Sequence, residues 1–267
     1  MFPEHRLVYL ETPKVACTSV KVALCLDLCG ASLEDLTDGR WPRPFPEAVV
    51  HDRAAYPARS LADLAPAELA EAVTAAGWIR FCVVRDPFSR VFSAWESKVF
   101  VGDAGMFEQF QPLGSGDRFS DGELDVRASF CEFVGDLAAR RDLYFDDMHF
   151  RPQHQVVHEG AVPFTDIVRL EGLAEFVTRL GSHLGRPLVV PRVNEGLGMP
   201  WRDNYDEHAI SVVGDLYAED IARFGFERPS VPAASGTRLD PVAVRLLAQL
   251  RLRVRQVAAI HQSSVGP

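Results

Sequence analysis

The chain has 267 residues, of which 47% are hydrophobic and 24% charged, a composition typical of a globular protein and not of a disordered chain. Its net charge of −9 argues against general nucleic-acid binding but leaves room for a local basic pocket. No apolar run reaches the length of a membrane-spanning helix and the first residues lack the layout of a signal peptide, so we expect no integral membrane segment and a cytoplasmic location.

Short apolar runs with strand-forming residues alternate along the chain with segments whose apolar residues recur at helical spacing. The run 78–84 is almost continuously apolar, as in a strand buried on both faces of a parallel sheet. Asp86 and Pro87 follow it as the N-cap and first residue of a helix. In chain order we expect a strand over 6–10, a helix over 18–29, a connection over 31–65, a helix over 66–76, a strand over 78–84, a helix over 87–100, a glycine-rich loop over 101–124, a helix over 125–141, a strand over 166–170, a helix over 173–184, a polar loop over 191–204 and helices over 206–224 and 241–261.

This order predicts an α/β fold with a central parallel sheet that is flanked by helices. We expect one main domain over 1–226, a linker over 227–240 and a C-terminal amphipathic helix over 241–267. Ligands of such sheets bind beyond the carboxyl ends of the strands. Two strand ends carry suitable polar groups there, the one before Lys14 and the one that ends at Arg85.

The segment from Thr12 to Ser19 joins the first strand to the first helix. The backbone N–H groups of such a loop and the positive end of the helix form an anion site. Lys14 adds a charge, and Thr18 and Ser19 add hydroxyl donors. The segment is not the phosphate-binding loop of ATPases, which has glycines and carries its lysine at the end. A helix capped by Thr18, with Lys14 incidental on the surface, remains the alternative.

A second polar segment follows the buried strand. Arg85 leaves the strand at its carboxyl end, where a desolvated guanidinium needs an anion. Ser93 lies about two turns into the next helix, so Arg85 and Ser93 together suit one phosphate group. Alternatively, Arg85 pairs with an acidic neighbour and Ser93 is a packing residue. We expect Arg90 to be structural, in a salt bridge on the flank of the helix.

Four segments, in this order, resemble the carbohydrate sulfotransferases that use 3′-phosphoadenosine 5′-phosphosulfate (PAPS), and among them the chondroitin 4-O-sulfotransferase type. The first two segments are the nucleotide motifs, and the resemblance covers roughly residues 6–226. The segments are Pro-Lys-Val-Ala-Cys-Thr-Ser over 13–19, Val-Arg-Asp-Pro-Phe-Ser-Arg-Val-Phe-Ser-Ala-Trp over 84–95, His-Phe-Arg-Pro-Gln over 149–153 and the Tyr-x-x-Asp and Phe-Gly-Phe pattern over 217–226.

The resemblance implies a P-loop-like three-layer sandwich and PAPS as the sulfuryl donor, with no metal. It implies that the first motif surrounds the 5′-phosphate and the sulfuryl group, and that Arg85 and Ser93 hold the 3′-phosphate. Animal members of this group are Golgi membrane proteins with an N-terminal anchor, whereas we expect a soluble member here. The residues implied for the first motif are Lys14, Val15, Ala16, Cys17, Thr18 and Ser19.

A general base is needed to take the proton of the acceptor hydroxyl, and His51 is our first candidate. It lies between the two nucleotide motifs, where several glycan sulfotransferases place a catalytic histidine, and Asp52 or another carboxylate could orient its ring. An exposed loop histidine is the alternative. His149, more simply structural within its motif, and Glu11, directly ahead of the first motif, are the competing candidates.

We therefore expect a sulfotransferase that moves the sulfuryl group of PAPS to a hydroxyl of a carbohydrate or glycosylated small molecule and releases 3′-phosphoadenosine 5′-phosphate (PAP). Lys14 would act on the leaving group, and no nucleic acid takes part. The rivals are an inactive nucleotide- or glycan-binding module of the same fold and an ATP-dependent kinase. For the helix over 241–261 we expect plain packing, with a contact between identical subunits or a flank over the anionic cofactor as the alternatives.

Overall fold

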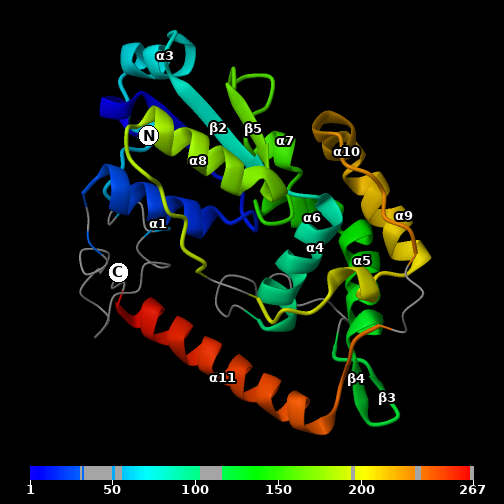
Figure 1. The fold of residues 1–267 in the computed structure, drawn as a ribbon. Coiled ribbons are helices and arrows are strands. Elements are labelled where there is room, and N and C mark those ends of the chain that lie inside the picture. Colours follow the sequence, from blue (N-terminus) through cyan, green and yellow to red (C-terminus); the bar gives the residue numbers. More distant parts are fainter. Residues whose placement is uncertain are drawn as a thin grey trace. The chain divides into compact units, whose positions relative to one another are not determined.

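The computed structural model describes residues 1–30, 32, 50–51, 56–102, 116–193, 196–231 and 236–264, with the backbone alone over 257–264 (Figure 1). They form two compact units. The first unit comprises Met1–Arg85 and Gln153–Glu195, and the second comprises Asp86–Pro152 and Gly196–Pro267. These units do not test the expected domain boundary at residue 226, which stays a prediction.

The first unit contains a parallel sheet, as the alternation of strands and helices predicted. Its strands are β1 (Leu7–Leu10), β2 (Ile79–Val84) and β5 (Asp166–Arg169), in the order β1-β2-β5. Leu10 lies beside Cys82, and Val84 lies beside Arg169. The three carboxyl ends therefore lie at one edge of the sheet, where β1 continues into the Lys14 loop and β2 continues into Arg85.

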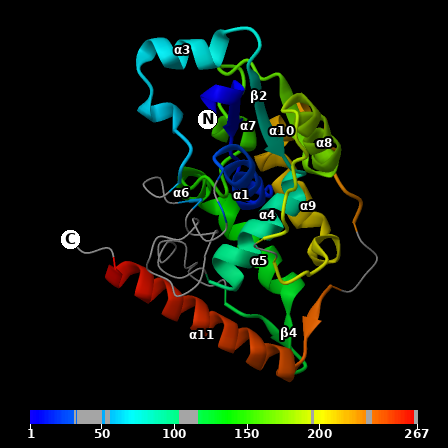
Figure 2. The ribbon, with the colours of Figure 1, turned by 60° about the vertical axis from the view of Figure 1, so that its left-hand side comes forward.

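Helices of the first unit pack on both faces of this sheet. On one face, α1 (Cys17–Leu28) and α8 (Leu173–His183) share a core with side chains of all three strands (Figures 1 and 2). On the other face, Ala72 of α3 (Pro66–Thr74) packs with Val8 of β1. The short helix α7 (Gln153–Val156) lies in the same unit, with single 3-10 turns at Pro3–His5, Leu61–Asp63 and Leu170–Gly172.

The second unit is mainly helical around an aromatic core. Edge-to-face pairs join Phe130 to Phe92, Trp95 and Tyr205, with ring centroids 4.8–5.1 Å apart, the geometry that aromatic rings prefer. Its helices are α4 (Pro87–Trp95), which continues into a π-helical turn at Glu96–Phe100, α5 (Val126–Ala139), α6 (Arg141–Asp146), a 3-10 turn at Trp201–Asn204, α9 (Glu207–Leu216), α10 (Ala218–Phe224) and α11 (Pro241–Ser264).

Two segments that were expected to lack secondary structure contain strands, which is a correction. The expected loop over 101–124 contains β3 (Phe119–Ser120) and the start of β4 (Glu123–Asp125), and the expected linker over 227–240 contains β6 (Arg238–Leu239). They form an antiparallel sheet in the order β3-β4-β6. Strands of two or three residues are too short for an alternating pattern, and the pairing of Leu124 with Leu239 is far from local.

One expected helix is divided in two. The helix expected over 206–224 breaks at Tyr217, whereas the helix expected over 125–141 is α5, which is followed directly by α6, a short helix that was not expected. Tyr217 is almost fully buried, and its hydroxyl donates to the backbone oxygen of Phe150 at 2.6 Å. This tertiary contact fixes the break, so local periodicity could not reveal it. None of the helices in the described ranges is both long and apolar enough to cross a membrane.

Candidate active site

The loop over 11–16 joins the carboxyl end of β1 to α1. Its backbone is left-handed at Lys14 (φ 67°) and Ala16 (φ 54°), without a glycine at either position. Each such residue costs on the order of 1 kcal/mol and persists only where the surrounding structure imposes it, often at ligand sites. Left-handed turns gather successive N–H groups into a concave backbone that binds anions. The loop therefore has the backbone of an anion site at the start of a helix.

The first turn of α1 has no side-chain cap among the described residues. Its N-cap is Ala16, which has no side-chain acceptor, and Thr18 lies inside the first turn. The alternative in which Thr18 caps the helix is therefore wrong. The first N–H groups of a helix have no partner within it. Here these donors and the positive end of the helix dipole face whatever anion occupies the loop.

The hydroxyl of Thr12, in the same loop, lacks a hydrogen-bond partner in the described part of the chain. Its side chain is completely buried, and its Oγ1 is one of two buried side-chain oxygens in the described residues without a hydrogen bond. Such an unsatisfied group costs about 1–3 kcal/mol. The left-handed backbone and the uncapped helix start fit an anionic group here, and the Thr12 hydroxyl is an unsatisfied donor in the same loop. The other unsatisfied oxygen is the hydroxyl of Tyr9, whose ring is stacked on Phe81.

His51 reaches the start of α1 from the connection after it. Its Nε2 lies 2.9 Å from Thr18 Oγ1, and its Nδ1 lies 3.9 Å from Glu11 Oε2. Glu11 in turn forms an ion pair with Lys21, at 3.1 Å. The structure thus brings together Thr18, His51 and Glu11, two of which were competing candidates for the base. Asp52, the neighbour suggested to orient the ring, lies outside the described residues.

The other residues of the first motif are largely buried. Val15 is in the core, and Ser19 Oγ accepts a hydrogen bond from the backbone N–H of Val193 at 3.3 Å. Burial raises the pKa of the Cys17 thiol, so it is neutral in this setting. Lys14 and Ala16 are half-buried. The cofactor contacts of these residues stay predictions.

Arg85 is held in place at three points. Its backbone N–H donates to Gln153 Oε1 at 2.9 Å, and its backbone oxygen accepts from Gln153 Nε2 at 2.7 Å. Its guanidinium donates to the backbone oxygen of Lys14 at 3.0 Å. The side chain is half-buried. These bonds join the two strand ends that the sequence singled out, and they direct a cation toward the Lys14 loop.

Ser93 lies in α4 and is half-buried. It belongs to the second unit and Arg85 to the first, so their joint grip on one phosphate stays a prediction. Arg90 was expected in a salt bridge on a helix flank, but its side chain is buried and donates to the backbone oxygens of Met148 and Arg151 at 2.8 and 2.9 Å. These contacts give Arg90 a structural role, and its salt bridge on the helix flank stays a prediction.

His149 forms a close pair with Asp147 in the second unit. Its Nδ1 lies 2.8 Å from Asp147 Oδ1, and its backbone N–H donates to the same oxygen at 2.7 Å. Burial opposes ionisation of Asp147, but these hydrogen bonds outweigh it and lower the pKa of the carboxyl below its ordinary value of 3.8. The pair closes a turn, which favours the structural role for His149.

Three residues near the strand ends were missed as parts of the site. Gln153 was quoted in a motif but not given a role, although the amide of a glutamine is suited to pair with a backbone N–H and oxygen. Lys21 has no sequence signal beyond its charge. Arg169 ends β5 beside Val84 and is exposed, and its position at the end of the third predicted strand was the signal available.

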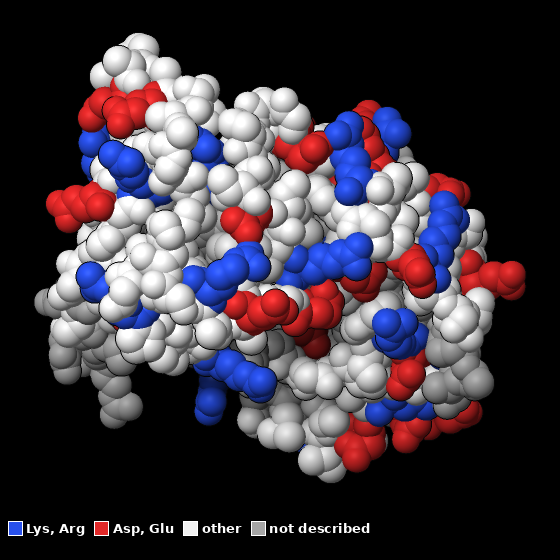
Figure 3. All heavy atoms as spheres, turned by 45° about the horizontal axis from the view of Figure 1, so that its top comes forward, with Lys and Arg blue, Asp and Glu red and all other residues white. Residues whose placement is uncertain are grey.

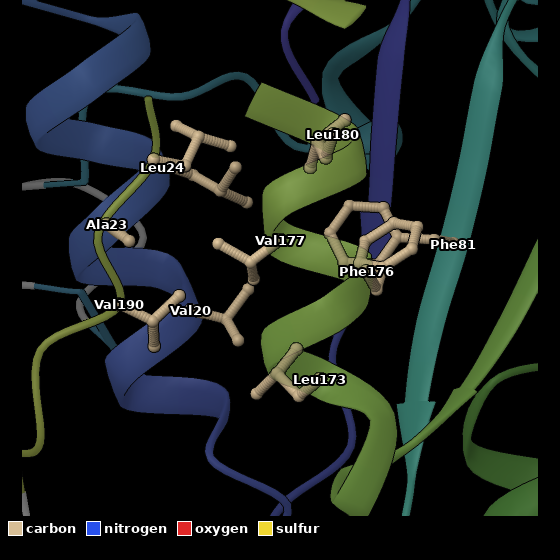
Figure 4. Close-up of a pocket in the computed structure, with 10 residues that line it drawn as sticks. Val20, Ala23, Leu24, Phe81, Leu173, Phe176, Val177, Leu180 and Val190 are labelled. Atoms are coloured by element: carbon tan, nitrogen blue, oxygen red, sulfur yellow. The ribbon is translucent and has the colours of Figure 1, made fainter. Parts of the chain in front are cut away.

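The cavity shown in Figure 4 is not a ligand site. It lies between α1 and α8, and only apolar side chains line it, among them Val20, Leu24, Phe176 and Val177. A phosphate or sulfate group would have no donor there. The cavity is a gap in the packing of the apolar core, and this core holds α1 against α8.

Charged side chains of both signs are interspersed on the face drawn in Figure 3. Lysine and arginine do not gather there into the continuous basic surface typical of nucleic-acid binding. The described residues contain no group of three or more His, Cys, Asp or Glu side chains placed to hold a metal ion.

Comparisons with known proteins point the same way as the motifs. The family described as the sulfotransferase family matches residues 1–227. Carbohydrate sulfotransferase 10 of Homo sapiens is 31% identical over 250 residues, which are 85% of this chain and 66% of that protein. Carbohydrate sulfotransferase 12 of Xenopus laevis is 22% identical over 254 residues, which are 84% of this chain and 59% of that protein. This chain therefore spans about three fifths to two thirds of the length of these relatives.

No solved structure matches the chain. The family assignment rests on the sequence match, which extends over 227 of 267 residues and includes the Lys14 loop, Arg85 and the Pro-Gln motif. The chain belongs to the sulfotransferase family.

Proposed function

We propose that this protein transfers the sulfuryl group of PAPS to a hydroxyl of a carbohydrate or glycosylated small molecule and releases PAP. The observation that carries the proposal is the left-handed loop of Lys14 and Ala16, with the orphaned Thr12 hydroxyl and the uncapped start of α1. The family match over this loop and the two carbohydrate sulfotransferases named above favour a sulfated donor and a carbohydrate acceptor.

Each residue of the proposed site has one task. When bound, PAPS supplies a sulfuryl group that is attached to a phosphate, and this phosphate is the leaving group. The backbone N–H groups of the loop and the hydroxyls of Thr18 and Ser19 donate to its anionic oxygens, and Lys14 neutralises the charge that grows on the leaving oxygen. Arg85 and Ser93 bind the 3′-phosphate. The reaction uses no metal.

His51 takes the proton of the acceptor hydroxyl. A hydroxyl is a weak nucleophile, and a base within hydrogen-bond reach removes its proton as the new S–O bond forms. A free histidine, with a pKa of about 6.5, is mostly neutral near pH 7 and able to accept a proton. Nε2 is the nitrogen that faces the phosphosulfate loop, because it already meets Thr18 Oγ1.

The proposal also includes the fold, the domain boundary, the location and the role of α11. The fold is a P-loop-like three-layer sandwich, whose outer layers are α1 with α8 and α3. The main domain ends near residue 226, and the protein acts in the cytoplasm. Plain packing of α11 is favoured by Leu247, which is buried in the core of the second unit, and a contact between two copies through Val242 and Leu246 stays the alternative.

Two rival functions are tested by the same experiment. An inactive binding module would bind PAP but transfer nothing, and a kinase would use ATP. The purified chain is incubated with PAPS carrying a ³⁵S label, or with ATP carrying a γ-³²P label, and a panel of glycans and glycosides, and products are identified by mass spectrometry. We expect a product 80 Da heavier than its acceptor, carrying ³⁵S, only with PAPS, and its formation should be about 10²-fold slower or more with Lys14→Ala. Binding of PAP without transfer to any acceptor would favour the binding module.

A further inference from the structure

Three polar side chains lie in a row at the start of α1, with His51 between Glu11 and Thr18. Glu11 Oε2 lies 3.9 Å from His51 Nδ1, and Thr18 Oγ1 lies 2.9 Å from His51 Nε2. The imidazole is thus between a carboxylate and a hydroxyl, one on each ring nitrogen. The side chains of Glu11 and His51 are 37% and 43% exposed, so solvent reaches the pair but does not surround it.

We infer that Glu11 is a positioning residue for His51: it keeps the proton of the neutral ring on Nδ1, so that Nε2 is the accepting nitrogen, which meets Thr18 Oγ1 in this structure and takes the acceptor's proton during transfer. This inference rests on the proposed function, because it assigns His51 the base. A carboxylate beside Nδ1 favours the tautomer with N–H there. When Nε2 takes the proton, the imidazolium that forms is stabilised by the negative charge 3.9 Å away.

Glu11 is itself held by a second pair of residues. Lys21 Nζ lies 3.1 Å from Glu11 Oε2 and 3.3 Å from Oε1, so both carboxylate oxygens meet one ammonium. The ammonium of Lys21 also lies 4.9 Å above the ring of Tyr56, whose hydroxyl donates to the backbone oxygen of Lys21 at 3.3 Å. Lys21 is only 12% exposed. These contacts orient the carboxylate of Glu11 beside His51.

The first test needs neither donor nor acceptor. The ring nitrogens of His51 are followed by NMR over a pH titration of the full chain, and His51→Ala identifies the resonance. We expect the Nδ1–H tautomer at high pH, and a titration midpoint about 0.3–0.8 pH unit lower in Glu11→Gln, because a negative charge near the imidazolium is lost and Lys21 remains. Glu11→Asp should fall between the two. Glu175→Gln, the same change on an exposed residue of α8, should not move the midpoint.

The second test separates positioning from base catalysis. With PAPS and the acceptor that reacts in the screen, Glu11→Gln should lower kcat about 10-fold with the KM for PAPS unchanged. The double variant Glu11→Gln/His51→Ala should be no slower than His51→Ala, because the carboxylate has no ring to act on.

Three results would overturn the inference. They are an unchanged titration midpoint in Glu11→Gln, a dominant Nε2–H tautomer in the parent, or a double variant in which the two losses multiply. A chain that transfers sulfate to no acceptor would contradict the proposed function, while the NMR titration would still decide whether Glu11 controls His51.

Discussion

The side-chain amide of Gln153 forms two hydrogen bonds with the backbone of Arg85. Its Oε1 accepts from the Arg85 N–H at 2.9 Å, and its Nε2 donates to the Arg85 oxygen at 2.7 Å. The amide thus pairs with the backbone N–H and oxygen directly after β2, as a neighbouring strand would. Because Gln153 is completely buried, both bonds are shielded from water. The Arg85 guanidinium then reaches the backbone oxygen of Lys14. A residue of the Pro-Gln motif therefore fixes the direction in which a nucleotide-binding candidate points.

Replacing Gln153 should loosen Arg85. In Gln153→Ala both backbone groups of Arg85 lose their partner, so we expect about 1–3 kcal/mol less stability and weaker binding of PAP. Denaturant unfolding and calorimetry measure the two effects. Gln155→Ala, an exposed position of the same short helix, is the control and should change neither. Unchanged PAP affinity in a destabilised Gln153→Ala would show that the amide serves stability alone.

Arg85→Ala should act through recognition of the 3′-phosphate. A charge-assisted contact is worth about 1.5–3 kcal/mol, so the preference for PAP over adenosine 5′-phosphate should fall roughly 10- to 100-fold. Calorimetry with both nucleotides measures the preference. Arg179→Ala, which removes an exposed arginine of α8, is the matched control. If the Arg85→Ala protein keeps the parental preference, another residue reads the 3′-phosphate.

Lys14→Ala should lower turnover far more than nucleotide affinity. Its charge matters most when the leaving oxygen becomes negative, and we expect a loss of about 10²-fold or more in kcat. Alanine keeps the Cβ, so the cost of the left-handed backbone at φ 67° is the same in both proteins. Rates with saturating PAPS and binding of PAP give the comparison. Equal turnover in the two proteins would remove Lys14 from the mechanism.

Cys29 should be the most reactive thiol among those described. A hydrogen bond with Cys25 lowers the pKa of Cys29 to about 7, and the side chain is exposed, whereas Cys25 is buried. The thiolate is the reactive form, so alkylation by iodoacetamide should rise with pH about a midpoint near 7. Peptide mass spectrometry measures the rate at each cysteine. In Cys25→Ala the midpoint should move up toward 9, and a midpoint that stays near 7 would assign the shift to another group.

Local sequence determined the three strands of the parallel sheet and the start of α4. The continuous apolar run before Arg85 predicted a buried parallel strand, and β2 is one. Asp86 caps α4 by accepting from the backbone N–H groups of Phe88 and Ser89, as its type and place predicted. The cap depends on neighbouring residues alone, and burial on both faces leaves a continuous apolar run that can be read locally.

The motifs also determined which residues to consider for the site, but not how they are arranged. Lys14, Thr18 and Arg85 were named from their places at strand ends, and Lys14 and Arg85 are joined by a hydrogen bond. The sequence could not show that Ala16 is left-handed, because alanine rarely adopts that conformation and only the surrounding packing imposes it.

Only the tertiary structure decided the partners of the site residues. Gln153 meets Arg85 across 68 residues, and His51 meets Thr18 across 33. Asp52 or another carboxylate was expected to orient His51 and Glu11 was a competing base, and only the fold placed Glu11 beside Nδ1. The break at Tyr217 and the small antiparallel sheet belong to the same class. Each depends on a contact between residues distant in sequence, whose pairing is set by the closure of the chain and not by local periodicity.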